Sequence, residues 1–115
     1  MIQLQGVTKR YGKFTAVHPL DLHVKRGELF GFLGPNGAGK TTTIRMIAGV
    51  LRPTEGKILI GDRDITADPV AAKSQIGYIP DRPTLYEKLT GQEFLRFVSG
   101  LWGRNGTEAD RRADE

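Results

Sequence analysis

The sequence is organised around one glycine-rich stretch, Gly34-Pro35-Asn36-Gly37-Ala38-Gly39-Lys40-Thr41. This stretch fits the pattern G-x-x-x-x-G-K-[ST] at every position. Its glycines allow the backbone to take positive φ angles and to wrap closely around oxygen atoms, so that successive N–H groups converge on one anion. The pattern therefore predicts a phosphate-binding loop, or P-loop, for a nucleoside triphosphate.

The segments on both sides of the loop supply the context that a P-loop requires. Before it, residues 29–33 (Leu-Phe-Gly-Phe-Leu) form a continuous apolar run, which predicts a strand buried on both faces. After it, helical spacing predicts a helix from Lys40 with a buried stripe formed by Ile44, Ile47, Ala48 and Leu51. Both flanks disfavour the alternative of a glycine-rich turn that carries a lysine by chance. The glycine order G-x-x-G-x-G also excludes a dinucleotide-binding fingerprint.

Each part of the loop has an expected role in binding Mg-ATP. The phosphates are expected at a helix N-terminus, where the macrodipole and the unpaired N–H groups of the first turn favour anions. Lys40 is expected to reach the β and γ phosphates, the hydroxyl of Thr41 to ligate Mg²⁺, and Thr42 to bond a more proximal phosphate. The predicted nucleotide-binding residues of this segment are Gly34, Pro35, Asn36, Gly37, Ala38, Gly39, Lys40, Thr41 and Thr42.

The rest of the first 80 residues alternates short strands with turns. Residues 2–7 and 20–24 are predicted as half-buried strands, with a turn at Tyr11-Gly12-Lys13 between them. Pro53 and Gly56 are expected to end the P-loop helix. Further along, 58–60 and 76–79 are predicted as strands and 69–74 as a single helical turn.

The chain after Pro80 has a different pattern. Pro80 and Pro83 are expected to break it into a loop, and a helix is predicted to begin at Thr90, with Glu93 completing a capping box. The predicted buried face of that helix is formed by Phe94, Phe97, Val98 and Leu101. Residues 103–115 are polar and lack a periodic apolar residue, so we expect a linker or a cut end there.

Composition sets limits on the function. With 115 residues the chain has the length of one ordinary domain, and without cysteine it has neither a disulfide nor a thiolate zinc site. No apolar run approaches the roughly 20 residues that span a bilayer, so a soluble cytosolic polypeptide is expected. The net charge of +4 comes from scattered lysines and arginines, which disfavours a dedicated nucleic-acid role.

Residues 28–42 as a whole resemble the ATP-binding subunit of ABC transporters, which is a narrower likeness than the P-loop alone gives. The likeness extends from Ile2 to about Trp102. It includes Tyr11-Gly12, the small-strand unit 56–61 and the run Ile-Gly-Tyr-Ile-Pro at 76–80, which is similar to the approach to the family's Q-loop. Residues 85–95 are similar to the start of its helical subdomain.

This resemblance implies an α/β fold of the ABC ATPase type of P-loop NTPase, with an N-terminal antiparallel strand layer. It implies an N-terminal half of the ATPase core at 1–80, and a Q-loop with the truncated start of the helical subdomain at 81–115. By the same resemblance Tyr11 is expected to stack on adenine, although by itself it is equally a turn aromatic, and Val17 to contact the base or lie in the core. The implied partners are ATP, a second nucleotide-binding subunit and a transmembrane permease at the cytoplasmic face of the membrane.

The sequence also departs from the family pattern. Asp81 stands where the family has the Q-loop glutamine, so it is a candidate Mg²⁺ ligand that, when ionised, cannot donate a hydrogen bond to water as an amide does. No signature motif follows, and Asp114-Glu115 follows Arg111-Arg112-Ala113 instead of an apolar strand, so it is not a Walker B motif. The chain is therefore expected to be the N-terminal part of an ATP hydrolase, with nucleotide binding but negligible turnover.

Two alternatives stay open at this point. One is a non-catalytic interaction module in which the P-loop is a relic. The other is a different P-loop enzyme, a GTPase or a kinase, which is disfavoured because the sequence has no Asn-Lys-x-Asp guanine motif and no acceptor-substrate lid.

Overall fold

The structure is a computed structural model that describes residues 1–82, 85–104 and 106–114. Contacts divide the chain into two compact units, Met1–Tyr78 and Ile79–Glu115, and each is described by itself. Pro83, which was expected to break the chain together with Pro80, lies outside the described residues.

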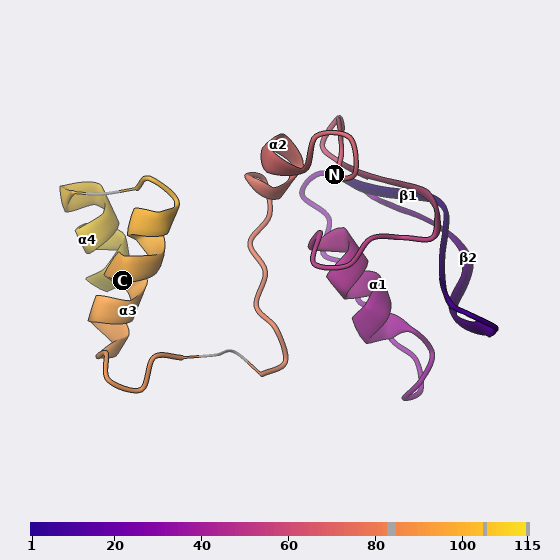
Figure 1. Cartoon of the computed structure of the whole chain (residues 1–115). Coiled ribbons are helices and arrows are strands. Elements are labelled where there is room, and N and C mark those ends of the chain that lie inside the picture. Colours follow the sequence, from indigo (N-terminus) through magenta and orange to yellow (C-terminus); the bar gives the residue numbers. More distant parts are fainter. Residues whose placement is uncertain (83–84, 105, 115) are drawn as a thin grey trace. The chain divides into compact units, whose positions relative to one another are not determined.

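The first unit is built on a four-stranded antiparallel sheet with the strand order β2-β1-β3-β4. Strand β1 (Ile2–Tyr11) and strand β2 (Phe14–Val24) form a long hairpin (Figure 1). The turn between them includes Gly12 at φ 57°, a backbone angle that favours glycine. The other two strands are β3 (Glu55–Ile60) and β4 (Arg63–Asp64). The predicted antiparallel strand layer is confirmed, and its first two strands are longer than predicted.

Helix α1 (Lys40–Ile47) packs against β2 and β3. Its buried side chains are Thr43 and Met46, whereas Ile44 is 42% exposed, so the predicted stripe was wrong at Ile44. The periodicity predicts the spacing of the apolar residues but not the rotation of the helix about its axis. That rotation depends on the sheet residues against which the helix packs. The buried hydrophobic core consists of Leu4, Val7, Val17, Met46, Ile58, Ile60, Ile65 and Ala72.

The end of α1 also differs from the prediction. The helix ends at Ile47, well before Pro53, because Gly49 takes φ 66° and its N–H bonds to the Met46 carbonyl at 3.0 Å. The N–H of Val50 then bonds back to the Arg45 carbonyl at 2.9 Å. A glycine in the left-handed conformation after the last helical turn is a common way for a helix to end.

Two predicted strands are absent from the described structure. The apolar run 29–33 forms no strand, and Leu29 and Leu33 are 100% and 95% exposed. Residues 76–79 are also irregular, with Ile79 87% exposed. A buried strand needs paired strands along its edges and other elements that cover its faces. No described strand pairs with either run. The apolar pattern indicates that these runs need strands and covering elements around them. It does not show whether those elements are present.

Helix α2 (Pro69–Lys73) confirms the predicted helical turn. The Asp68 side chain accepts a hydrogen bond from the Ala71 N–H at 3.3 Å, and Pro69 occupies the first turn. Proline is well tolerated there because its missing N–H has no partner within the helix.

The second unit contains two helices, α3 (Gly91–Leu101) and α4 (Thr107–Asp114). The capping box of α3 is confirmed, but its predicted buried face is wrong, since none of its residues is buried and Leu101 is 71% exposed. An amphipathic helix is buried only where another element covers it. Among the described helices of the whole chain, none is long and apolar enough to cross a bilayer.

Within the polar tail, which was predicted as a linker or cut end, residues 107–114 form helix α4. Glu108 pairs with Arg111 at 3.0 Å and with Arg112 at 3.1 Å, at the i,i+3 and i,i+4 spacings that support a helix. Arg96 of α3 bonds Asp110 of α4 at 2.7 Å. The charges that suggested a solvated tail therefore pair along and between the helices.

The capping box of α3 predicts a dependence on pH. The Thr90 N–H donates to the Glu93 carboxylate at 2.8 Å, and this bond is the main reason why the pKa of Glu93 lies below its usual 4.5. Because the folded pKa is the lower one, the stabilisation is fully present above pH 4.5 and is lost as the pH falls through the folded pKa. We expect the chemical shift of the Thr90 amide proton to follow the titration of the Glu93 carboxyl in acid, as measured by NMR. A Glu93→Gln variant, which cannot ionise, should show no such acid-induced transition.

Candidate functional site

The glycine-rich loop leads directly into the N-terminus of α1. Gly39 is the N-cap residue, with φ 84°, and its carbonyl accepts the Thr43 N–H and the Thr43 hydroxyl, both at 2.8 Å. Gly37 also has φ 84°, and the first turn carries no acidic side chain. The loop therefore offers an anion the unpaired N–H groups and the positive end of the helix dipole.

Lys40, the first residue of α1, folds back over this loop. Its ammonium donates to the carbonyl of Pro35 at 2.9 Å and to that of Gly34. Both acceptors are neutral carbonyl oxygens, so these bonds orient the ammonium without cancelling its charge. A full positive charge is thus held at the mouth of the loop, where phosphates are expected.

A cleft of about 260 Å³ opens beside the loop. It is lined by Phe14, Ala16, Asn36, Gly37, Gly39, Lys40, Thr41 and Thr42. The structure thus brings most of the predicted loop residues to one cavity. Gly34, Pro35 and Ala38 do not line it but shape the loop behind it, where the Ala38 N–H bonds the Pro35 carbonyl at 3.2 Å.

The cleft wall formed by β2 was missed by the sequence interpretation. Phe14 and Ala16 both line the cleft, and Phe14 is 66% exposed. Phe14 is the cross-strand partner of Tyr11 on β1. The signal that could have found it is the short turn after Tyr11, since a two-residue hairpin connection places 14 opposite 11.

Gly39 allows the loop to lie close to β2. A Cβ at this position would lie 2.6 Å from the Ala16 carbonyl oxygen and 3.0 Å from the side chain of Val17. The absence of a side chain therefore lets α1 begin directly on the strand. Val17 is 6% exposed and belongs to the core, so the structure places it beneath the loop and not among the lining residues.

Tyr11 also lies outside the residues that line the cleft. Its side chain is 52% exposed at the end of β1, and the ammonium of Lys9 lies 5.1 Å from its ring centroid. The adenine-stacking role of Tyr11 stays a prediction. Asp81 belongs to the second unit and is exposed, and its role as a Mg²⁺ ligand likewise stays a prediction.

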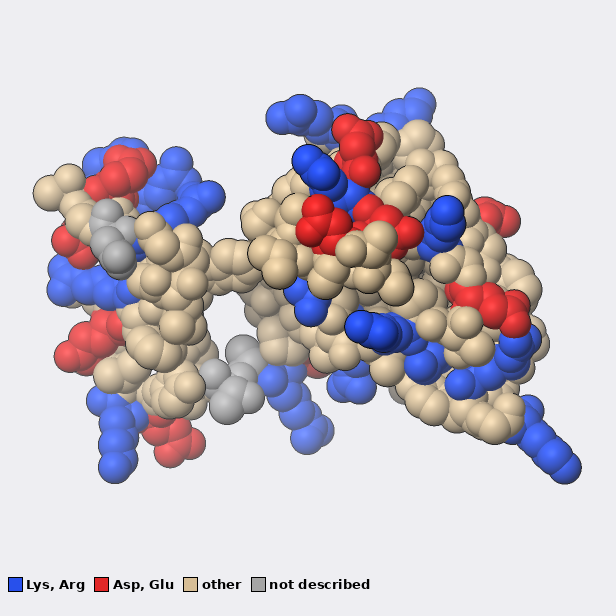
Figure 2. All heavy atoms as spheres, turned by 45° about the horizontal axis from the view of Figure 1, so that its top comes forward, with Lys and Arg blue, Asp and Glu red and all other residues tan. Residues whose placement is uncertain are grey.

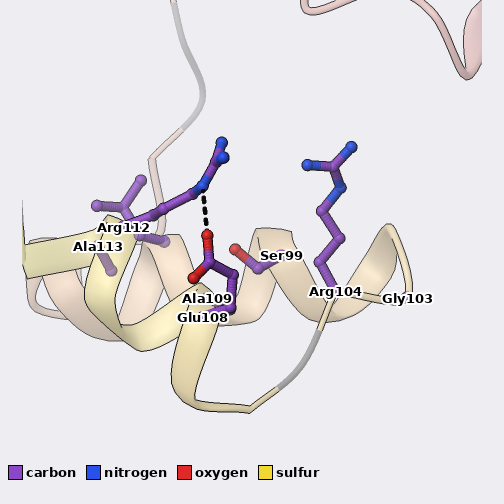
Figure 3. A pocket seen from close by; sticks show the side chains of 8 residues that line it. Ser99, Gly103, Arg104, Glu108, Ala109, Arg112 and Ala113 are labelled. Carbon is purple, nitrogen blue, oxygen red and sulfur yellow. Dashed lines mark hydrogen bonds and ion pairs between the residues drawn. The ribbon is translucent and has the colours of Figure 1, made fainter.

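A larger cleft of about 510 Å³ lies in the second unit, between α3 and α4 (Figure 3). It is lined by Leu95, Ser99, Gly103, Arg104, Glu108, Ala109, Arg112 and Ala113. Figure 3 shows the bond between Glu108 and Arg112, which partly neutralises the charge of the cleft. Size alone favours this cavity, but the smaller cleft lies at the N-terminus of α1 and is lined by Lys40, whose partners among the described residues are neutral carbonyls. The smaller cleft is therefore the candidate functional site.

The surface charge is mixed. Figure 2 shows Lys and Arg side chains spread over the face in view and interspersed with Asp and Glu. Among the described residues no group of three or more His, Asp or Glu side chains could hold a metal ion by itself.

The family model described as "ABC transporter" matches residues 17–115. The chain belongs to the ABC transporter family. Within the family it is similar to ATP-binding proteins. It is 43% identical over 115 residues to the linearmycin resistance ATP-binding protein LnrL of Bacillus subtilis (strain 168). The aligned region covers 100% of this chain and 37% of LnrL. It is 42% identical over 106 residues to the ATP-binding protein YbhF of Escherichia coli (strain K12). That aligned region covers 92% of this chain and 18% of YbhF.

Solved structures agree with this assignment to the ABC family. The structure of an ATP-binding subunit of an ABC transporter superposes with a TM-score of 0.85 and 34% identity, covering 96% of this chain and 46% of that one. A dimeric ATP-binding cassette, MJ0796 bound to ADP and Pi, gives a TM-score of 0.83 and 26% identity, covering 98% of this chain and 54% of that one. These neighbours confirm the predicted ABC ATPase type of α/β P-loop fold. The chain spans about half the length of these cassettes.

Proposed function

We propose that this ABC family chain binds Mg-ATP in the cleft between the P-loop and β2. The observation that supports this most strongly is the N-terminus of α1, where Lys40 holds an uncompensated ammonium beside the backbone N–H groups that follow Gly39. A triphosphate carries several negative charges in a row and is the ligand that such a site suits best. The likeness to ATP-binding subunits favours this function over an interaction module with a relic loop.

The residues at the cleft fit a phosphate-bound Mg²⁺. Thr41 is exposed, lines the cleft and carries a hydroxyl, which is the oxygen type that this ion accepts. Mg²⁺ binds through few protein groups and several phosphate oxygens, so one hydroxyl beside the phosphates suffices on the protein side. Bound there, Mg²⁺ would neutralise phosphate charge.

For the whole protein we propose ATP hydrolysis coupled to membrane transport. Its partners would be a second nucleotide-binding subunit and a transmembrane permease, which would hold it at the cytoplasmic face of the membrane. The dimeric MJ0796 cassette supports the pairing of two such subunits. In this proposal the residues described here bind the phosphates. Hydrolysis also requires a second metal-binding strand and a carboxylate that orients water.

Calorimetric titration of the chain tests the proposed binding. We expect a heat of association with Mg-ATP at millimolar nucleotide or below, and roughly tenfold weaker binding when EDTA removes Mg²⁺, because phosphate charge is then uncompensated. Competition between ATP and GTP distinguishes an ATP site from a GTPase site. If no heat is detected with well-folded chain, the proposed function is wrong. Stronger binding of GTP would assign the loop to a different class of P-loop protein.

A further inference from the structure

Lys9 lies on β1, two residues before Tyr11, and its side chain makes two contacts. Its ammonium is 5.1 Å from the centroid of the Tyr11 ring, within the range of about 6 Å at which a cation is attracted to an aromatic face. The same ammonium donates a hydrogen bond of 2.8 Å to the carbonyl of Arg52. The cation is therefore held over one face of the ring instead of moving freely in solvent.

The carbonyl that holds Lys9 is itself well fixed. Arg52 lies in the segment between α1 and β3, and this segment is fastened along β1. The Thr54 N–H bonds the Thr8 carbonyl at 2.8 Å, the Arg10 N–H bonds the Thr54 hydroxyl at 3.0 Å, and the Arg10 guanidinium pairs with Glu55. Lys9 is half-buried among these contacts. Its head group thus joins the segment that follows the P-loop helix to the aromatic ring at the end of β1.

We propose that Lys9 is a positioning residue for the base of the nucleotide, an inference that rests on the proposed function. The ammonium occupies one face of the Tyr11 ring and fixes the orientation of the ring. Tyr11 remains 52% exposed, so ring surface that the ammonium does not cover is open to a stacking partner. The partner that fits is a flat, uncharged aromatic such as a purine, because a second cation would be repelled by Lys9.

This role has a specific energetic consequence. Lys9 acts on the base through Tyr11, whereas the phosphates are held by the P-loop and Lys40. Removal of the cation should therefore weaken only the part of the affinity that depends on the base. A general loosening of the fold would instead weaken the binding of every ligand of the loop.

The test compares Mg-ATP with Mg-tripolyphosphate, which offers the phosphates without a base. By calorimetry we expect Lys9→Met to weaken Mg-ATP binding about threefold to tenfold, because a ring that Lys9 no longer orients must be ordered when the base binds, with tripolyphosphate affinity unchanged. Lys9→Arg should restore most of the loss. Lys9→Gln, which keeps a donor for the Arg52 carbonyl without the charge, should behave like Lys9→Met. The matched control is Lys57→Met, which removes an exposed lysine of β3 and should change neither affinity.

A double-mutant cycle with Tyr11→Ala completes the test. If Lys9 acts through the ring, Lys9→Met should have no further effect on Mg-ATP binding once the ring is gone. Equal Mg-ATP affinity of wild type and Lys9→Met overturns the inference, and so does an equal loss for Mg-ATP and tripolyphosphate. These outcomes differ from failure of the proposed function, in which the wild-type chain itself binds no Mg-ATP.

Discussion

Replacement of Lys40 by alanine is expected to weaken Mg-ATP binding about 100-fold or more, because a charge-assisted bond to the phosphates contributes about 3 kcal/mol. In the structure the Lys40 ammonium lies at the loop, where its partners among the described residues are the neutral carbonyls of Gly34 and Pro35. Its charge is therefore available to the β and γ phosphates, and no other residue that lines the cleft is positively charged. Fluorescent ATP titrated into wild type and variant measures the change directly.

The fold should survive this substitution, since Lys40 is not part of the hydrophobic core. Lys57→Ala is the matched control, because it removes one exposed lysine from the same unit and should leave binding unchanged. Far-UV circular dichroism confirms that each variant is folded. Equal binding by wild type and Lys40→Ala would contradict the P-loop assignment and revive the interaction-module alternative.

Replacement of Gly39 by alanine is expected to lower the free energy of unfolding of the first unit by about 2–4 kcal/mol, through a left-handed backbone and a steric overlap. The new Cβ would lie 2.6 Å from the backbone oxygen of Ala16, which cannot rotate away as a side chain can. Either the loop or β2 must move, so nucleotide binding should be lost as well. Urea unfolding followed by circular dichroism gives the free energy.

Gly37→Ala separates the two causes. Gly37 has the same φ of 84°, but a Cβ there would meet no atom within 4 Å. It should therefore show only the backbone strain, about 1–2 kcal/mol. If both alanine variants lose the same free energy, the close approach of Gly39 to β2 has no energetic weight.

Local patterns predicted the elements whose causes are local. The capping box at Thr90 and Glu93 and the proline-started α2 follow from hydrogen bonds within a few residues, and the structure confirms both. The glycine-rich loop at the start of α1 is also a local feature and was placed correctly. Where the outcome depended on a distant partner, the same kind of pattern failed. The apolar run 29–33 and the apolar face of α3 both remain exposed.

The candidate site divides in the same way. Lys40, Thr41 and Thr42 could be assigned from the order of residues in the motif, and the structure brings them to one cleft. The motif did not identify Phe14 and Ala16, because they reach the loop through the packing of β2 against Gly39. Val17 could have served the ligand or the core, and burial places it in the core.

The order of residues predicted the glycine-rich loop, the helix that follows it and the ABC family, because each of these can be recognised from residues that lie close together in the chain. Only the tertiary structure decided which side of α1 is buried, which strand forms the second wall of the cleft, and which carbonyl holds Lys9. Each of these depends on contacts between segments far apart in the sequence. Residue spacing cannot encode them, since the same apolar stripe or lysine can be satisfied by many different neighbours.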